Sequence, residues 1–434
     1  MHRRFRVPGG SGALITQESP MSYSVQDVRA AFPSLSLRDD GRPRVYLDNP
    51  AGTQVPLTVM QAISDSFMQA CANQGGYFRT SREADRIVDQ AHRAMAEFLG
   101  TPDPSEIIIG PNSTTLTFQL SRSIGRELQA GDEVILTRMD HEANVAPWLE
   151  MAEERGLVVR WAEFDADSWR VELEHLRALI TPKTRLLALN YASNLTGAVN
   201  DVPALVKAAK AAGLLVYVDA VQLAPHAAID VVALGCDFLM CSPYKFFGPH
   251  LGVLWGRRSL LEQLHAYKCR SVSGELPGKF ETGTPAIELQ AGLIAAVEHF
   301  ASLGAGRVPG ASRREQIVAA FGLITEHERA LTAQLLAGLA TLADVSIIGP
   351  DERSSAAPRV PTVSVRHRRI AAARLAQALA GENIFVWSGH NYALGIVEQL
   401  GIPAEEGVLR IGAAHYNTSE EVEQTLSAIR RLVR

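Results

Sequence analysis

A lysine between two aromatic residues is the feature of this 434-residue sequence that most clearly suggests chemistry. Lys245 lies in the run Cys-Ser-Pro-Tyr-Lys-Phe-Phe-Gly-Pro, residues 241–249, directly after an apolar stretch. Only six of the 42 basic residues are lysines (183, 207, 210, 245, 268 and 279), so each is worth inspecting individually. A lysine in apolar surroundings has a lowered pKa and can form a Schiff base with a carbonyl compound. The alternative is a structural lysine that extends its charge into solvent from a strand end.

Another apolar run of the sequence ends in a carboxylate. Asp219 is the last residue of the run 215–219, and Gln222 follows three positions later. Open α/β sheets bind ligands at the carboxyl ends of their strands. A buried carboxylate there can keep the ring nitrogen of pyridoxal 5′-phosphate (PLP) protonated and the ring electron-withdrawing. The alternative role for Asp219 is an ordinary helix N-cap.

The segment 110–115, Gly-Pro-Asn-Ser-Thr-Thr, is a candidate phosphate site. It joins an apolar strand to a helical pattern, so free backbone N–H groups and hydroxyls would face an anion at a helix N-terminus. Ordinary capping by Ser and Thr gives the same pattern. The sequence has no Gly-x-Gly-x-x-Gly after a strand and no Gly-x₄-Gly-Lys-[Ser/Thr], so dinucleotide and Walker-type sites are not supported. The remaining interpretation of this segment is a site for a phosphate-bearing cofactor that is not bound through a dinucleotide or Walker motif.

Alternating β-rich and helical patterns must position these residues. Helical patterns at 114–129 and 202–212 each precede a glycine, Gly131 and Gly213, as expected past a helix C-terminus. The βαβ order throughout predicts an α/β domain with a parallel sheet and helices on both faces. The seven predicted strands are 106–109, 133–137, 158–162, 185–190, 215–219, 238–242 and 253–255.

The chain after about residue 285 has a different pattern. A mostly helical stretch to about 343 precedes short strands and helices, which predicts a second, α+β domain. The predicted strands there are 345–348, 362–365, 384–387 and 408–411, with a loop at 349–361 and helices near 370–381 and from 419. We expect a flexible leader at 1–20, with Met21 as a possible start, an N-terminal segment at 21–47 that packs on the small domain, a large domain at 48–300 and a small domain at 301–434.

Composition excludes several classes of protein. With 47% apolar and 21% charged residues and a net charge of -5, the chain has no global basic field, so we expect no nucleic-acid partner. No apolar run approaches the ~18 residues of a membrane span, so we expect no membrane partner. The four cysteines (71, 236, 241 and 269) show neither Cys-x-x-Cys nor zinc spacing, which predicts free thiols, a cytoplasmic location and no metal site.

Seven motifs in order along nearly the whole chain resemble one family. They are Tyr-Leu-Asp-Asn-Pro-Ala-Gly at 46–52, Asp-His-Glu-Ala-Asn-Val-Ala-Pro-Trp at 140–148, Asn-Leu-Thr-Gly at 194–197, Val-Asp-Ala-Val-Gln at 218–222, the lysine run at 241–249, Phe-Glu-Thr-Gly-Thr-Pro at 280–285, and Arg410 ahead of Tyr-Asn-Thr-Ser-Glu-Glu at 416–421. The sequence resembles class V aminotransferase-fold, PLP-dependent enzymes of the cysteine desulfurase-like branch. The resemblance implies fold type I of the PLP-dependent transferases, with a seven-stranded, mainly parallel sheet in the large domain.

The resemblance also implies roles for individual residues. Lys245 would form the Schiff base with PLP and then move the Cα proton, Asp219 would pair with the pyridine nitrogen, and His141 would stack on the ring. The other cofactor-binding residues would be Gln222 at the phenolic oxygen, Ser113, Thr114 and Ser242 at the phosphate, Tyr244, and Thr284 from the partner subunit of a homodimer. Arg410 and Asn194 would bind the α-carboxylate, since a guanidinium binds a carboxylate through two hydrogen bonds, with Tyr392 and Tyr77 also at the substrate. The alternatives are an interior histidine for His141 and a surface ion pair for Arg410.

The sequence departs from the desulfurases at the sulfur acceptor. Their Ser-Gly-His-His-Cys-type loop corresponds to Ser-Gly-His-Asn-Tyr-Ala at 388–393, with Tyr392 at the position of the thiol. A phenol cannot accept a persulfide. Their Arg-Gly-x-His stretch corresponds to 75–80, Gly-Gly-Tyr-Phe-Arg-Thr, and Tyr244 replaces the histidine before the lysine, so the substrate pocket is more aromatic unless these rings serve packing.

We therefore expect a homodimeric PLP enzyme that acts on a small amino-acid substrate. The predicted reaction is β-elimination, as by a carbon-sulfur lyase, on a cysteine-derived or other β-substituted amino acid. The first alternative is a class V aminotransferase, which shares every cofactor contact. Further alternatives are an amino-acid epimerase, a desulfurase with a relocated acceptor thiol such as Cys269, and a binding protein that has lost catalysis.

Overall fold

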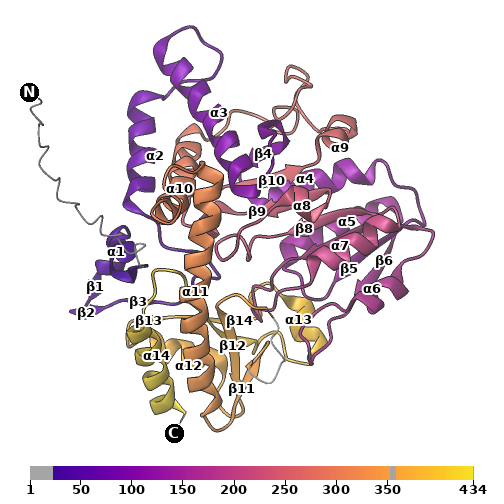
Figure 1. The fold of residues 1–434 in the computed structure, drawn as a ribbon. Helices are drawn as coiled ribbons and strands as arrows, with labels where there is room; N and C mark the ends of the chain where they lie inside the picture. The colour runs from indigo at the N-terminus through magenta and orange to yellow at the C-terminus, as the bar shows by residue number, and fades with distance from the viewer. Residues whose placement is uncertain (1–22, 352–357, 434) are drawn as a thin grey trace, which may run out of the picture.

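The computed structural model describes residues 23–351 and 358–433 (Figure 1). The leader predicted for residues 1–20 lies outside the described residues. None of the helices in these two stretches has the length and apolar character that crossing a bilayer requires.

The larger sheet has seven strands in the spatial order β4-β10-β9-β8-β7-β5-β6. β10 is antiparallel to both of its neighbours, and the other neighbouring strands are parallel. The prediction of a seven-stranded, mainly parallel sheet is confirmed. The strands are β4 (Ile107–Gly110), β5 (Glu133–Thr137), β6 (Val158–Ala162), β7 (Thr184–Asn190), β8 (Leu215–Asp219), β9 (Phe238–Cys241) and β10 (Gly252–Gly256).

The prediction of βαβ order throughout is wrong at one connection. Between β9 and β10 the chain makes only the short 3₁₀ turn η4 (Pro243–Lys245) before it reverses direction. An antiparallel pair needs no long crossover, so residues 242–251 stay close to the strand ends. Lys245 is therefore held against the sheet.

Apolar residues on both faces of the strands explain why helices cover both faces. Ile107 and Ile109 pack with α3 (Arg79–Leu99), α7 (Val202–Ala211) and α10 (Ile287–Ala305). Ile108, which points the other way, packs with α4 (Ser113–Gly125) and α5 (Ala146–Arg155). Strands buried on both faces are near-continuous apolar runs, which is why the sequence revealed them.

One predicted helix end is wrong and one is right. α4 ends at Gly125 rather than at 129, so Gly131 (φ 85°) belongs to the turn before β5. α7 ends at Ala211, with Ala212 as its C-cap, and Gly213 adopts the left-handed conformation (φ 79°) expected after a helix.

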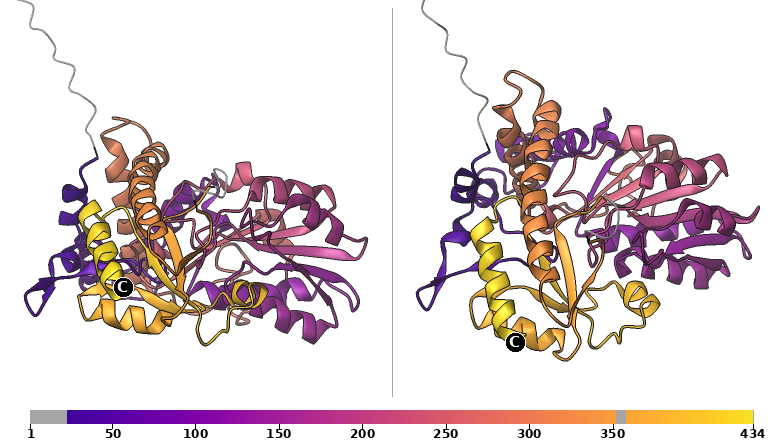
Figure 2. Two further views of the ribbon diagram at one scale, coloured as in Figure 1. Left: turned by 90° about the horizontal axis from the view of Figure 1, so that it is seen from below. Right: turned by 60° about the horizontal axis from the view of Figure 1, so that its bottom comes forward.

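A second sheet of four antiparallel strands lies in the C-terminal part, in the order β11-β12-β15-β14. The long helix α11 (Arg313–Ala340) runs from beside α10 to this sheet, as Figure 1 and both views of Figure 2 show. The strands are β11 (Val345–Ile348), β12 (Thr362–His367), β14 (Trp387–Gly389) and β15 (Val408–Gly412), and the helices are α12 (Ala372–Ala380), α13 (Leu394–Gln399) and α14 (Ser419–Leu432).

The strand predicted at 384–387 is two strands in different sheets. β13 (Ile384–Phe385) pairs in parallel with β3 (Val45–Tyr46), whereas Trp387 begins β14. A bridge between Asp48 and Gly412 continues the contact between the two ends of the chain.

The remaining elements are α1 (Val25–Ala30), β1 (Arg38–Asp39), β2 (Arg42–Pro43), α2 (Leu57–Gln69), α6 (Leu173–Leu179), α8 (Val231–Leu234), α9 (Arg258–Gln263), and the 3₁₀ turns η1 (Pro33–Ser36), η2 (Pro104–Glu106) and η3 (Glu142–Asn144).

Candidate active site

Lys245 is buried at the carboxyl end of the large sheet. Its Nζ donates a hydrogen bond to the carbonyl oxygen of Pro50. Burial, followed by the nearby charge of Arg410, lowers the pKa of the Lys245 amine to about 7, although Asp48 and Asp219 act in the opposite direction. The amine is therefore largely neutral above pH 7, the state in which it is a nucleophile.

Asp219 ends β8 and is buried beside the same lysine. Its Oδ1 accepts the Val221 N–H at 2.8 Å. Burial raises the pKa of the Asp219 carboxyl to about 6, against the lowering effects of that N–H and of Lys245. Gln222, one turn onward, is also buried and donates from Nε2 to Thr362 Oγ1 at 3.3 Å.

His141 lies where β5 leads into η3, on a loop that buried polar groups hold rigidly. Asp140 accepts hydrogen bonds from Thr137 and from Asn144 Nδ2 (2.6 Å), and the Trp148 indole donates to Asn144 Oδ1 at 2.9 Å. His141 Nδ1 accepts the Ala143 N–H at 3.0 Å. Burial, then the charges of Lys245 and Arg410, lowers the pKa of His141 to about 3, so its ring is neutral.

The N-terminus of α4 supplies the predicted phosphate residues. Asn112 caps the helix by accepting the Thr115 N–H at 2.8 Å, which leaves earlier N–H groups of the first turn for an anion. Ser113 Oγ contacts Ser242 Oγ across the strand ends. Gly252 of β10 makes this approach possible, because a Cβ there would lie 2.5 Å from the Ser113 nitrogen.

Arg410 projects from β15 and is buried. Nη1 donates to the Asn194 carbonyl at 3.2 Å, Nη2 donates to Asp48 Oδ1 at 3.1 Å, and Nε has no partner among the described residues. Burial lowers the pKa of Arg410, and the Asp48 carboxylate opposes that shift. Asp48 had no assigned role from the sequence, and Arg410 is in a buried pair rather than in the surface ion pair considered above.

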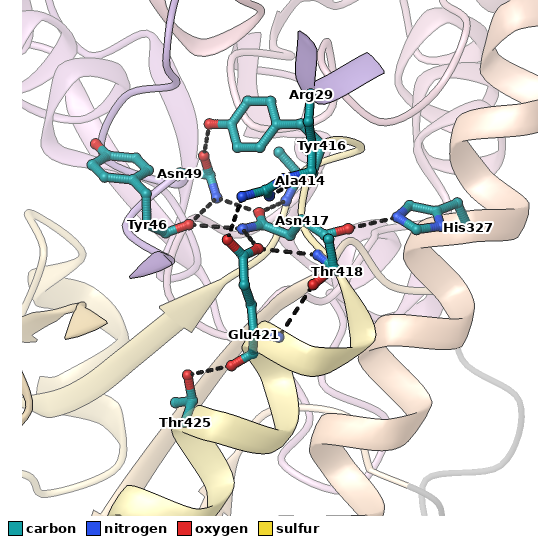
Figure 3. Close-up of polar contacts among 10 residues, drawn as sticks. All are labelled: Arg29, Tyr46, Asn49, His327, Ala414, Tyr416, Asn417, Thr418, Glu421 and Thr425. Carbon is teal, nitrogen blue, oxygen red and sulfur yellow. Dashed lines mark hydrogen bonds and ion pairs between the residues drawn. The ribbon is translucent and has the colours of Figure 1, made fainter. Parts of the chain in front are cut away.

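A hydrogen-bond network holds the segment that contains Asp48 and Pro50 (Figure 3). Asn49 Nδ2 donates to Asn417 Oδ1 at 3.1 Å, and Asn49 Oδ1 accepts from the Tyr416 hydroxyl. Asn417 in turn donates to the Tyr46 carbonyl and to Glu421 Oε2, both at 2.9 Å. Residues from the C-terminal part of the chain thus hold the segment that carries the Pro50 carbonyl, which accepts the hydrogen bond from Lys245.

Two adjoining cavities surround these groups. The inner one, about 130 Å³, is lined by nine of the thirteen predicted site residues, and the outer one, about 510 Å³, adds two, so the cavities bring together eleven. The inner set includes Lys245, Asp219, Gln222, His141, Ser113, Thr114, Ser242, Tyr244 and Asn194, and the outer cavity shares several of these and adds Arg410 and Tyr392.

Two predicted residues lie elsewhere in the chain described here. Thr284 lines a separate cavity with Cys71 and Phe67, and Tyr77, in the loop before α3, is 96% exposed. Neither contributes to the Lys245 cavities of its own chain. Their predicted roles therefore depend on a second subunit.

The loop that replaces the desulfurase thiol covers the outer cavity. Asn391 and Tyr392 both have positive φ (52° and 58°), which is uncommon for residues other than glycine. Backbone hydrogen bonds hold them in place: Asn194 Nδ2 donates to the Asn391 carbonyl, and the Glu142 N–H donates to the Tyr392 carbonyl, both at 2.8 Å. Tyr392 is 65% exposed, and its ring centroid lies 5.5 Å from that of His141.

Comparison with known proteins places this geometry in a family. The model of the family "Aminotransferase class-V" matches residues 45–425. The aminotransferase-like protein FGM3 of Gibberella zeae is 32% identical over 95% of this chain and 99% of that protein, and a cysteine desulfurase of Yersinia pestis is 31% identical with the same coverage. The chain belongs to the class V aminotransferase family.

Solved structures agree with this assignment. The cysteine desulfurase CsdA of Escherichia coli has a TM-score of 0.80 and 26% identity, covering 95% of this chain and 98% of that one. The cysteine desulfurase of Thermococcus onnurineus NA1 has a TM-score of 0.83 and 27% identity, covering 95% and 99%. The predicted family, fold type I and membership of a superfamily of PLP-dependent enzymes are confirmed.

The residues present fit PLP. Gln222 Oε1, Asn194 Oδ1 and Arg410 Nε are buried polar atoms without a partner among the described residues, and all three side chains line the cavities. Unpaired buried polar atoms are costly, so their concentration here indicates a polar ligand. A carboxylate, hydroxyls at a helix N-terminus and a neutral lysine match the ring nitrogen, phosphate and aldehyde of PLP.

Proposed function

We propose that this protein is a PLP-dependent carbon-sulfur lyase that acts by β-elimination on an S-substituted cysteine or similar β-substituted amino acid. The observation that carries the proposal is the identity of the residue at the acceptor position. Tyr392 stands there, and none of the four cysteines lines either Lys245 cavity in the described chain. Without a thiol to accept sulfur, the sulfur must leave with its own substituent.

Each residue has a part in this reaction. Arg410 and Asn194 bind the α-carboxylate and so orient the bonds at Cα. Lys245 takes the Cα proton at Nζ. Asp219 would hold a proton on the pyridine nitrogen of PLP, and the neutral His141 side chain would stack against the cofactor ring. PLP, when bound, supplies the electron-withdrawing ring that stabilises negative charge at Cα.

The overall reaction balances with water alone. The Cα–H and Cβ–S bonds break, the sulfur leaves with the electron pair of its bond and takes up a proton, and a thiol is released. The remaining unsaturated amine adds water and breaks down to one keto acid and one ammonia. No external oxidant, reductant or keto acid is needed.

The test is a reaction of the holoenzyme with S-propylcysteine. We expect propanethiol, keto acid and ammonia in equal amounts, without added keto acid and without a protein-bound persulfide. A strict need for a keto-acid cosubstrate would contradict the proposal. With cysteine in place of S-propylcysteine, a persulfide on Cys269 of the wild type would instead support a desulfurase with a relocated acceptor, because only a substrate with a free thiol can leave its sulfur as a persulfide.

Transamination is the second candidate, favoured by the 32% identical relative that is named an aminotransferase-like protein. Arg410, Asn194 and Asp219 would act in the same way. Lys245 would differ only in where it releases the proton that it holds at Nζ. Accumulation of pyridoxamine phosphate when no keto acid is added would identify this reaction.

We also propose a homodimer in which Thr284 serves the partner's site. Large apolar side chains are exposed on α2, among them Leu57, Met60, Phe67 and Met68, and exposed apolar patches often mark protein interfaces. Light scattering should give twice the mass of the chain. Thr284→Ala should weaken PLP binding, whereas a monomer that binds PLP normally would contradict this arrangement.

A further inference from the structure

The outer cavity has opposite chemical character at its two ends. Its inner end contains the cationic side chain of Arg410 and the amine of Lys245, and its rim contains Trp387, Tyr392 and Glu142. Trp387 is 55% exposed and Tyr392 is 65% exposed. None of these three rim side chains is among the groups that match the ring nitrogen, phosphate and aldehyde of PLP.

Strand pairing places Trp387 beside Arg410. The two residues are direct partners in the antiparallel pair of β14 and β15. Side chains of direct partners lie on the same face of a sheet. The indole and the guanidinium therefore stand next to each other on one wall, with the indole nearer the rim.

Glu142 has a carboxylate without a counter-charge. The residue is half-buried, and no described residue donates a hydrogen bond or an ion pair to its side chain. Arg138, four positions before Glu142, pairs with Glu398 at 3.0 Å and lies over the Trp161 ring at 4.7 Å. Burial, then the charge of Glu398, raises the pKa of the Glu142 carboxyl.

The Glu142 backbone is held beside that of Tyr392. Its N–H donates to the Tyr392 carbonyl at 2.8 Å, so the two residues stay adjacent. The rim thus contains two aromatic rings and one carboxylate that has no partner among the described residues. Such a group attracts cations through both the ring faces and the negative charge.

We propose that the substrate is an amino acid with an extended side chain that ends in a cation, such as an ammonium or guanidinium group. With the α-carboxylate at Arg410, the cationic end lies against Trp387 and Tyr392 and pairs with Glu142. The inference rests on the proposed function, because it uses Arg410 as the carboxylate site, and it adds the class of side chain.

The experiment compares two isosteric substrates in the holoenzyme. S-(2-aminoethyl)cysteine carries an ammonium group where S-propylcysteine carries a methyl group. For each we would measure kcat/KM for keto-acid release, and the initial Kd from the absorbance change of the bound cofactor, which does not require elimination. We expect the cationic substrate to bind roughly three- to thirty-fold more tightly than its neutral isostere, from one cation–ring contact and one partly exposed ion pair.

Two variants with the same change of charge locate the effect. Glu142→Gln should remove most of the preference and leave the Kd for S-propylcysteine nearly unchanged. Glu150→Gln is the matched control, because Glu150 is exposed on α5 and lines neither cavity. Trp387→Leu should reduce the preference while keeping an apolar side chain.

The outcomes separate this inference from the lyase proposal. A Glu142-dependent preference in Kd without keto-acid release would retain the inference and contradict the lyase reaction. Elimination of both substrates with equal Kd values would retain the lyase and overturn the inference. Failure of either amino acid to bind, or an equal loss of preference in Glu150→Gln, would also overturn it.

Discussion

The inner and outer cavities are built from different parts of the fold. Lys245, Asp219 and Ser242 follow or end strands of the large sheet and are buried, so the sheet itself sets their positions. The outer rim comes from the edge strand β14, from the loop after it and from η3, with exposed rings and two residues of positive φ. This difference implies that the large sheet sets the geometry of the inner cavity, where the cofactor would bind. The substrate side of the outer cavity depends more on loops, whose sequence can change without disturbing the sheet.

The first prediction concerns a substitution in the inner cavity. Lys245→Ala removes both the covalent attachment and the proton carrier, so turnover should fall by about 10³-fold or more for every substrate. PLP should still bind through the phosphate and Asp219 contacts. Borohydride treatment followed by peptide mapping checks the site: the wild type should retain the cofactor on Lys245, and a label on another lysine would contradict the assignment.

The second prediction concerns the boundary between the two cavities. Arg410→Lys keeps the charge and loses the two-pronged donor, which should lower kcat/KM for amino acids by about 10- to 150-fold. Cofactor affinity should change far less. The control is an amine that lacks the α-carboxylate: if the wild type uses it as well as it uses the amino acid, Arg410 does not bind that group.

The third prediction uses the environment of Lys245 in the protein without its cofactor. Because burial lowers the pKa of this amine to about 7, its neutral fraction rises about tenfold between pH 6 and pH 8 and then levels off. The rate of PLP attachment, followed by absorbance, should show the same rise and plateau. A rate that keeps increasing toward pH 10 would mean that the amine is solvated.

The smallest effect is expected at the rim. Tyr392→Phe keeps the ring and its backbone hydrogen bond and removes only an exposed hydroxyl, so kcat/KM for S-propylcysteine should change by less than about twofold. Steady-state kinetics would check this. A much larger loss would show that the Tyr392 phenol takes part in the chemistry. The inner and outer cavities could then no longer be assigned separate roles.

The sequence predicted the inner end well because its signals are local. Buried strands are continuous apolar runs, and a lysine or carboxylate at the end of such a run is conspicuous. The partner of Arg410 had no local signal, since Asp48 is 362 positions away and a contact between distant segments leaves no periodic pattern. The division of residues 384–389 between two sheets and the direction of β10 were missed for the same reason: both depend on which segments pair in three dimensions.

The network of Figure 3 also has a consequence for biosynthesis. The hydrogen bond of Asn49 to Asn417 and the ion pair of the neighbouring Asp48 with Arg410 join the first part of the chain to residues that are synthesised 368 and 362 positions later. At ~5–20 residues per second, Asp48 waits about 20 to 70 s for Arg410 to be made. During that interval the large sheet can form, but the carbonyl that accepts from Lys245 is not yet held in place. The lysine cavity can therefore be completed only after Arg410 and Asn417 have been synthesised, long after Lys245 itself.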